Sequence, residues 1–246
     1  MTRRTLLAGA AVPFVHAAGG RRALIVADEF PAMEVLATRL KAGAGVESRI
    51  VAQTGMPAGL AEFDTVIVYI HRGIGEPAEK AFIEYANAGG RLLLLHHSIS
   101  SGKRKNRWWL PFLKISLPAK PFEEGGYKYY EDITLDIVNL APGEPVSSNG
   151  VAYPAAVTFE GAARPGFRLL GTEVYLNHEF LAPRTHLLGF RFEDVKTGKT
   201  FEQKSAGWYM RAGRGLVMYF MPGHSVRDFE NPSYGQILVN AAAFRP

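Results

Sequence analysis

Apolar residues in the first half of this chain fall into short unbroken runs separated by segments of helical character. The runs at residues 23–27, 66–70 and 92–95 lack polar alternation, which is typical of strands buried on both faces. A further strand is predicted at residues 46–51. Residues 31–41 begin at a proline and residues 77–88 end before a glycine, and both segments are predicted helices. Strands that alternate with helices at this spacing predict βαβ units and a parallel sheet.

The second half of the chain has a less regular pattern. Residues 100–106 form a predicted polar loop, residues 107–113 a short aromatic helix, and residues 153–167 an irregular connection rich in proline, glycine and alanine. Strands are expected at residues 127–139, 186–192, 206–210 and 216–221, and a last helix at residues 232–244. The segment at residues 167–175 carries an acid near its middle. No internal repeat or long linker interrupts the sequence, so we expect a single domain over residues 18–246.

Histidines stand where three of the buried runs end. His71 follows one run, the pair His96 and His97 follows the next, and His224 follows the last. Because the carboxyl ends of parallel strands share one edge of a sheet, where open α/β proteins bind ligands, we expect these histidines to lie at one pocket. Glu173 is expected to join them from a less regular region that folds back over that edge.

These residue types favour acid–base chemistry or metal binding. Histidine titrates near neutral pH and a glutamate can share its proton, so we predict that His96, Glu173 and His224 are catalytic. His71 and His97 are expected to line the substrate site, with His97 pointing away from its neighbour. Imidazole and carboxylate groups also bind zinc, nickel, manganese or iron, for which His71, His96 and His224 are the candidate ligands. No compact ligand motif such as HExxH occurs, so the sequence leaves the cofactor open between a divalent metal and none.

Composition narrows the function classes. The chain of 246 residues is 47% hydrophobic and has no cysteine, which excludes disulfides, zinc–thiolate sites and a cysteine nucleophile. The net charge of +5 is concentrated in a few places, above all in a basic loop at residues 103–107. Basic residues beside tryptophans can bind single-stranded nucleic acid, but a solvated loop accounts better for so small an excess. We therefore expect a small-molecule partner and no nucleic acid.

The first 17 residues have the features of an export signal. Arg3 and Arg4 resemble a twin-arginine motif, residues 6–15 are apolar, and Val15-His16-Ala17 is an acceptable cleavage site. The apolar stretch is too short to span a bilayer, so no stable membrane insertion is expected. The sequence thus predicts export to the periplasm or the extracellular space. The alternatives are an ordinary secretory signal or a misassigned start codon.

Taken together, these motifs resemble the ThuA-like family, which is named for a trehalose-utilisation protein. The resemblance covers nearly all of the chain after the leader, and the order and spacing of the motifs carry it. The matching segments are residues 89–98, residues 172–175, residues 213–215 with the strand that ends at Gly223 and His224, and residues 231–234.

The resemblance implies a flavodoxin-like or class I glutamine amidotransferase-like three-layer sandwich with a mostly parallel central sheet. It also implies sugar or keto-sugar metabolism. The histidines and Glu173 suit an isomerase, epimerase or lyase acting on such a sugar, and Tyr175 is expected at the substrate. His96 takes the turn where amidotransferases have a cysteine, and Ser98 lacks a Gly-x-Ser-x-Gly context, so neither nucleophile is expected. Thr172 stands where the family usually has an aspartate. The alternative is a non-catalytic carbohydrate-binding protein that keeps the pocket. A homo-oligomer is compatible with either reading.

Removal of the leader is directly testable. We expect protein produced in its native host to begin near Ala18, because the arginine pair, the apolar stretch and Val15-His16-Ala17 form a processing signal. Intact-mass spectrometry of the purified protein checks this. A mass that retains Met1 in most of the molecules would contradict the prediction.

Overall fold

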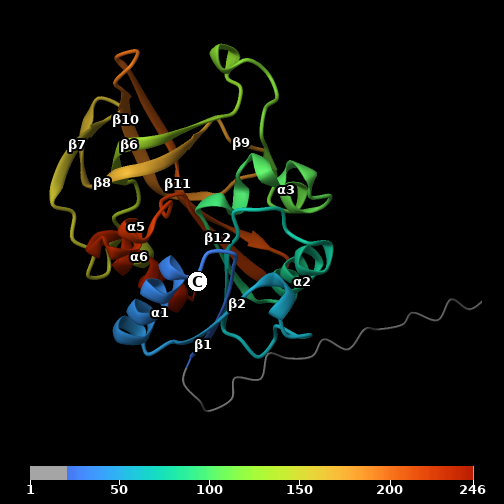
Figure 1. Ribbon diagram of the computed structural model, residues 1–246. Helices are drawn as coiled ribbons and strands as arrows, with labels where there is room; N and C mark the ends of the chain where they lie inside the picture. The colour runs from blue at the N-terminus through green and yellow to red at the C-terminus, as the bar shows by residue number, and fades with distance from the viewer. Residues whose placement is uncertain (1–20, 246) are drawn as a thin grey trace, which may run out of the picture.

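One sheet of ten strands organises the part of the chain that the structure describes, residues 21–245 (Figure 1). This computed structural model gives the strand order β2-β1-β3-β4-β12-β11-β10-β6-β8-β7. The predicted leader at residues 1–17 lies outside the described residues. The fold is therefore mixed α/β around a large central sheet, as the sequence pattern indicates.

The first half of the sheet is parallel. It consists of β1 (Arg22–Ala27), β2 (Glu47–Val51), β3 (Thr65–Tyr69), β4 (Arg91–Leu95) and β12 (Gly215–Phe220). Every residue of β3, β4 and β12 is buried, whereas β2 at the edge is not. The unbroken apolar runs thus correspond to strands covered on both faces.

Helices cover both faces of this parallel half. Helices α1 (Pro31–Ala44), α5 (Val226–Glu230) and α6 (Pro232–Ala243) pack together, while α2 (Glu76–Asn87) and α3 (Trp109–Phe112) lie across the sheet from them (Figure 1). The chain moves one way along the sheet from β1 to β2 and the other way from β3 to β4. Right-handed crossovers in opposite directions place α1 and α2 on opposite faces. Among the helices of residues 21–245, none has both the length and the apolar character to cross a bilayer.

The second half of the sheet is antiparallel, so the expectation of a mostly parallel sheet is wrong. It contains β6 (Lys128–Asn139), β7 (Ala155–Phe159), β8 (Ala162–Leu176), β10 (Thr185–Asp194) and β11 (Lys199–Ala212). The physical reason is the length of the connections. Turns of a few residues join β7 to β8, β10 to β11 and β11 to β12, and such short turns connect only antiparallel strands.

The segment expected to be an irregular connection, residues 153–167, contains β7 and the start of β8. Buried Val157 and Phe159 alternate with exposed Ala156 and Thr158, the pattern of a half-buried strand. The remaining elements are short: α4 (Pro145–Ser148), β5 (Ile115–Ser116), β9 (Glu179–Phe180) and the 3₁₀ turns Gln53–Gly55, His96–Ile99, Ser101–Lys105 and Phe122–Glu124.

The basic loop is only partly solvated, because Lys103 is fully buried. Its ammonium group donates to the backbone carbonyls of Ile70 (2.9 Å) and His71 (3.1 Å), which follow β3. Burial lowers the pKa of Lys103 to about 8, although the nearby charge of Asp28 opposes this shift. Lys103 therefore ties the loop to the end of β3, and the expectation of a solvated loop is wrong at this residue. Lys105, two residues on, is exposed.

This contrast predicts different effects of two lysine substitutions. Lys103→Ala should lower the free energy of unfolding by about 2–4 kcal/mol, because it removes buried packing and leaves two carbonyls without their donor. Lys105→Ala is the matched control and should change stability by less than about 0.5 kcal/mol. Urea denaturation followed by circular dichroism measures both. Equal stability of the two variants would contradict the structural role of Lys103.

Candidate functional site

The turn after β4 holds His96 in an uncommon backbone conformation. His96 has a φ of 45°, in the left-handed region that most residues other than glycine avoid at a cost of about 1–2 kcal/mol. Two contacts hold the turn: Tyr219 donates its hydroxyl to the His96 carbonyl (3.1 Å), and His96 Nδ1 lies 2.6 Å from the Met221 carbonyl. Since a carbonyl only accepts, Nδ1 carries a proton and Nε2 points into the site.

Glu173 lies within β8, a long strand with β-bulges in its pairing with β6, and not in the irregular region expected for it. Two irregularities of the pairing between β6 and β8 flank it. Gly171, with a φ of 62°, is an extra residue on β8, and Asp132, with a φ of 53°, lies in an extra stretch of β6. Bulges of this kind bend a strand and redirect its side chains. Glu173 and Tyr175, two residues apart, thus project from the same face of β8 toward the histidines.

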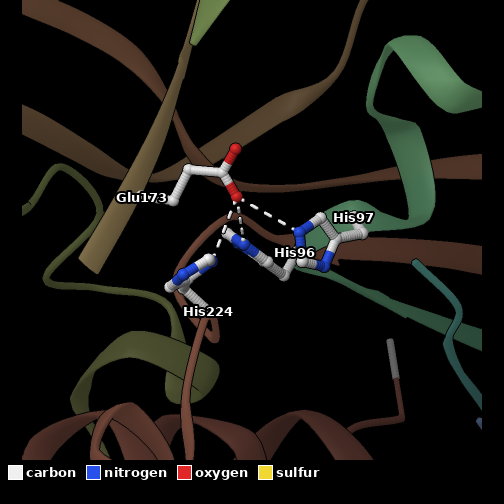
Figure 2. Close-up of side chains that lie close together, drawn as sticks. All are labelled: His96, His97, Glu173 and His224. Atoms are coloured by element: carbon white, nitrogen blue, oxygen red, sulfur yellow. Dashed lines mark hydrogen bonds and ion pairs between the residues drawn. The ribbon is translucent and has the colours of Figure 1, made fainter. Parts of the chain in front are cut away.

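Three imidazoles surround one carboxylate oxygen (Figure 2). Glu173 Oε2 lies 2.9 Å from His96 Nε2, 3.2 Å from His97 Nε2 and 3.2 Å from His224 Nδ1. Tyr175 donates its hydroxyl to the same oxygen at 2.9 Å. We call His96, His97, Glu173 and His224 the histidine–glutamate cluster. Each of its four members offers one atom able to ligate a metal, and these atoms lie within 4.8 Å of one another.

The cluster is nearly closed to solvent, and this sets its electrostatics. Burial would raise the pKa of the Glu173 carboxyl, but hydrogen bonds from the three imidazoles outweigh burial and hold that pKa well below its ordinary value. Burial lowers the pKa of His97 to about 4. The hydrogen bond to Glu173 raises the pKa of His224. His224 has the most exposed side chain of the four, at 31%, so the cluster meets solvent on its side.

His97 and His71 differ most from their expected positions. His97 was expected to point away from His96, yet both rings reach Glu173, because the chain continues from His96 in a tight 3₁₀ turn. His71 ends β3 beside β4 as expected, but its ring is exposed and outside the cluster. It stacks on His97 with ring centroids 3.9 Å apart, and its Nδ1 lies 3.3 Å from Glu29.

Asp228, which the sequence reading did not select, positions His224. Its buried carboxylate accepts from the backbone N–H groups of Gly223 (3.1 Å) and His224 (2.8 Å), and from the Thr172 hydroxyl (2.7 Å). Thr172 faces the opposite side of β8 from Glu173 and so does not reach the cluster. The available signal was the sequence Ser225-Val226-Arg227-Asp228, a helix-capping pattern directly after His224.

A cavity of about 1110 Å³ lies beside the cluster, against β6 and the turn between β10 and β11. Tyr127 connects the two features: it lines the cavity, and its ring stacks on that of Tyr175 with centroids 6.3 Å apart. Tyr129, Tyr130 and Arg104 also line the cavity. Two aromatic rings, those of Tyr127 and Tyr175, thus lie between this cavity and Glu173.

The contact between Thr172 and Asp228 predicts that an acidic residue at position 172 would repel the Asp228 carboxylate. Thr172→Asp should lower the free energy of unfolding by about 3–5 kcal/mol, because it places a second buried carboxylate against Asp228. Adding Asp228→Asn should recover at least half of that loss, since the amide can donate to the new carboxylate and still accept from the backbone. Thr172→Ser keeps the hydroxyl and is the control. Thermal unfolding of the four proteins tests this, and an undisturbed Thr172→Asp protein would refute it.

Comparisons with known proteins support the fold. No protein-family model matches the sequence, and no curated protein matches it in sequence. Among solved structures, a ThuA-like protein from Parabacteroides merdae superposes with a TM-score of 0.64 at 12% identity, over 91% of this chain and 89% of that one. A ThuA-like protein from Bacteroides uniformis gives a TM-score of 0.61 at 17% identity, over 94% and 93%.

A third solved structure, a cytoplasmic protein from Salmonella typhimurium LT2, gives a TM-score of 0.60 at 14% identity, over 90% of this chain and 98% of that one. At such low identity, similarity over nearly the whole length of both chains is evidence about architecture. It agrees with the resemblance carried by the strand-end histidines and the segment around Glu173. The chain therefore has the fold of the ThuA-like proteins.

Proposed function

We propose that this protein is an enzyme of sugar or keto-sugar metabolism that moves a proton next to a carbonyl group, as isomerases and epimerases do. The observation that carries the proposal is the buried Glu173 carboxylate in contact with three imidazoles and the Tyr175 hydroxyl. Groups that accept and donate protons at hydrogen-bond distance from one another are what such a reaction requires. The absence of cysteine excludes amide hydrolysis by a cysteine nucleophile.

The proposed chemistry assigns different tasks to the residues of the cluster. Isomerisation or epimerisation removes a proton from a carbon beside the carbonyl and returns one to a neighbouring carbon or to the opposite face. His96 performs the acid–base or ligand work, with Glu173 as its partner and His224 as the second imidazole. His224 is placed to meet a substrate first, because it is the most exposed of the three.

Substrate binding is assigned to the surroundings of the cluster. His71, His97 and Tyr175 line its edges, and Tyr175 stacks on Tyr127, which lines the tyrosine-rich cavity. Aromatic faces together with polar and charged side chains suit a sugar, whose rings have apolar faces and hydroxyl edges. The same cavity would serve a carbohydrate-binding protein without catalysis. The contact between carboxylate and imidazole favours the enzyme.

Proton exchange in heavy water tests the proposal directly. The purified full-length protein is incubated with a panel of keto-sugars, and deuterium incorporation beside the carbonyl is followed by NMR. We expect exchange with at least one substrate, and a loss of about 10²–10⁴-fold in His96→Gln, because proton transfer by a positioned side chain contributes about that much.

The control is His186→Gln. His186 lies on β10, outside the cluster, with Nδ1 at the Lys204 carbonyl, so its replacement should leave turnover within a few-fold. Circular dichroism of both variants confirms that they are folded. A folded His96→Gln protein with full turnover would contradict the assignment. Sugar binding without exchange in the unsubstituted protein would favour the carbohydrate-binding alternative.

A further inference from the structure

Polar groups crowd one oxygen of Glu173 beyond what that oxygen can accept. In the described part of the chain, Oε2 has four neighbours within 3.2 Å: three ring nitrogens and the Tyr175 hydroxyl. A carboxylate oxygen offers about two lone-pair sites, so four simultaneous hydrogen bonds cannot all be well formed. The three imidazole nitrogens are therefore arranged around Glu173 Oε2 in a way that hydrogen bonding to this oxygen alone does not explain.

The state of the His96 ring sharpens this mismatch. Its Nδ1 is committed to the Met221 carbonyl at 2.6 Å, so Nε2 is the ring nitrogen left to face the Glu173 carboxylate, at 2.9 Å. His97 adds a related fact: its buried Nδ1 has no hydrogen-bond partner among the described residues.

A cation resolves the conflict, since it attracts imidazole lone pairs and the carboxylate alike. We propose that His96, His97 and His224, together with Glu173, bind one divalent transition-metal ion such as zinc, manganese or cobalt. The four ligand atoms already lie within 4.8 Å of one another, whereas ligands about 2.0–2.2 Å from one ion are ~3–4 Å apart, so small side-chain movements suffice.

The surroundings have the features of a metal centre. Histidine ligands of metals almost always donate their other ring N–H to a carbonyl or carboxylate, as His96 does to Met221. Three imidazoles and a carboxylate without thiolates select zinc, manganese, iron, cobalt or nickel. The ligands come from three separate elements, the β4 turn, β8 and the loop after β12, which explains why no compact motif marks the site.

The ion would deepen the proposed function. A divalent metal held by His96, His97, Glu173 and His224 would polarise a carbonyl oxygen of the substrate and would stabilise the negative charge that forms when the neighbouring carbon loses its proton. This consequence rests on the proposed function, but the binding of the ion does not. The two can therefore fail separately, because ion binding is measured without any sugar.

The test uses the full-length protein made without a histidine tag, treated with a chelator and then titrated with Co²⁺, with Zn²⁺ and Mn²⁺ in parallel. We expect one ion per chain by elemental analysis, a dissociation constant in the micromolar range or tighter, and the visible absorption of protein-bound Co²⁺. His97→Gln should weaken binding by at least ~10-fold, the smallest loss typical of a residue that supports a metal site. His224→Gln, at the exposed side of the cluster, should do the same and avoids disturbing the β4 turn.

His186→Gln is the matched control, because His186 lies on β10 outside the cluster with Nδ1 at the Lys204 carbonyl, and it should bind the ion as the unsubstituted protein does. Less than ~0.1 ion per chain at ~100 µM metal would overturn the proposal. So would unchanged affinity in both His97→Gln and His224→Gln, which would place the ion elsewhere. Proton exchange on a keto-sugar by protein that binds no metal would leave the proposed function standing and remove the ion alone.

Discussion

The curling of the ten-stranded sheet is the constraint on which the site depends. Glu173 on β8 and His96 after β4 are separated by five strand-to-strand steps in the sheet order, a distance of ~24 Å in a flat sheet. Their side chains nevertheless lie 2.9 Å apart. The antiparallel half must therefore coil back over the carboxyl edge of the parallel half. Right-handed twist supplies part of this bend, and the bulges in the β6–β8 and β10–β11 pairs supply more.

The coiling of the antiparallel half brings the buried carboxylate of Glu173 to that edge. A buried carboxylate is stable only where hydrogen-bond donors or positive charges lie next to it. The effective penalty for burying one ion is several kcal/mol unless other groups offset it. The compensating groups come from the ends of two adjacent parallel strands, β4 and β12, which share one rim. Buried tyrosines fix these ends, Tyr219 at the His96 carbonyl and Tyr69 at the Gly223 carbonyl (2.8 Å). Packing beneath the rim thus decides where the imidazoles point.

The sequence predicts the parallel half and the histidines at its edge because both follow from local pattern. Unbroken apolar runs identify buried strands, and the strand order needs only short right-handed crossovers. The sequence does not predict that Glu173 lies within the long strand β8, or that the His97 ring joins that of His96 at Glu173. Both facts depend on dihedral angles at single positions, Gly171 and His96, whose consequences appear only when the sheet closes. Residues 153–167 differ from the prediction for a simpler reason. Their proline and glycine content indicates a loop, but Val157 and Phe159 alternate with small or polar residues, which is the stronger indication and predicts a strand.

The register of β8 separates two buried carboxylates that must not meet. Thr172 faces Asp228 and Glu173 faces the histidines, because successive side chains of a strand point to opposite faces. A slip of one residue would turn Glu173 toward Asp228 and present a threonine to three imidazoles. Gly171, whose positive φ suits an extra residue in a bulge, fixes the register just before this pair. A hydroxyl at residue 172 fits that arrangement because it donates to Asp228 without adding charge. The buried acid opposite residue 172 thus accounts for a hydroxyl at that position, and the carboxylate at residue 173 is left as the one that faces the histidines.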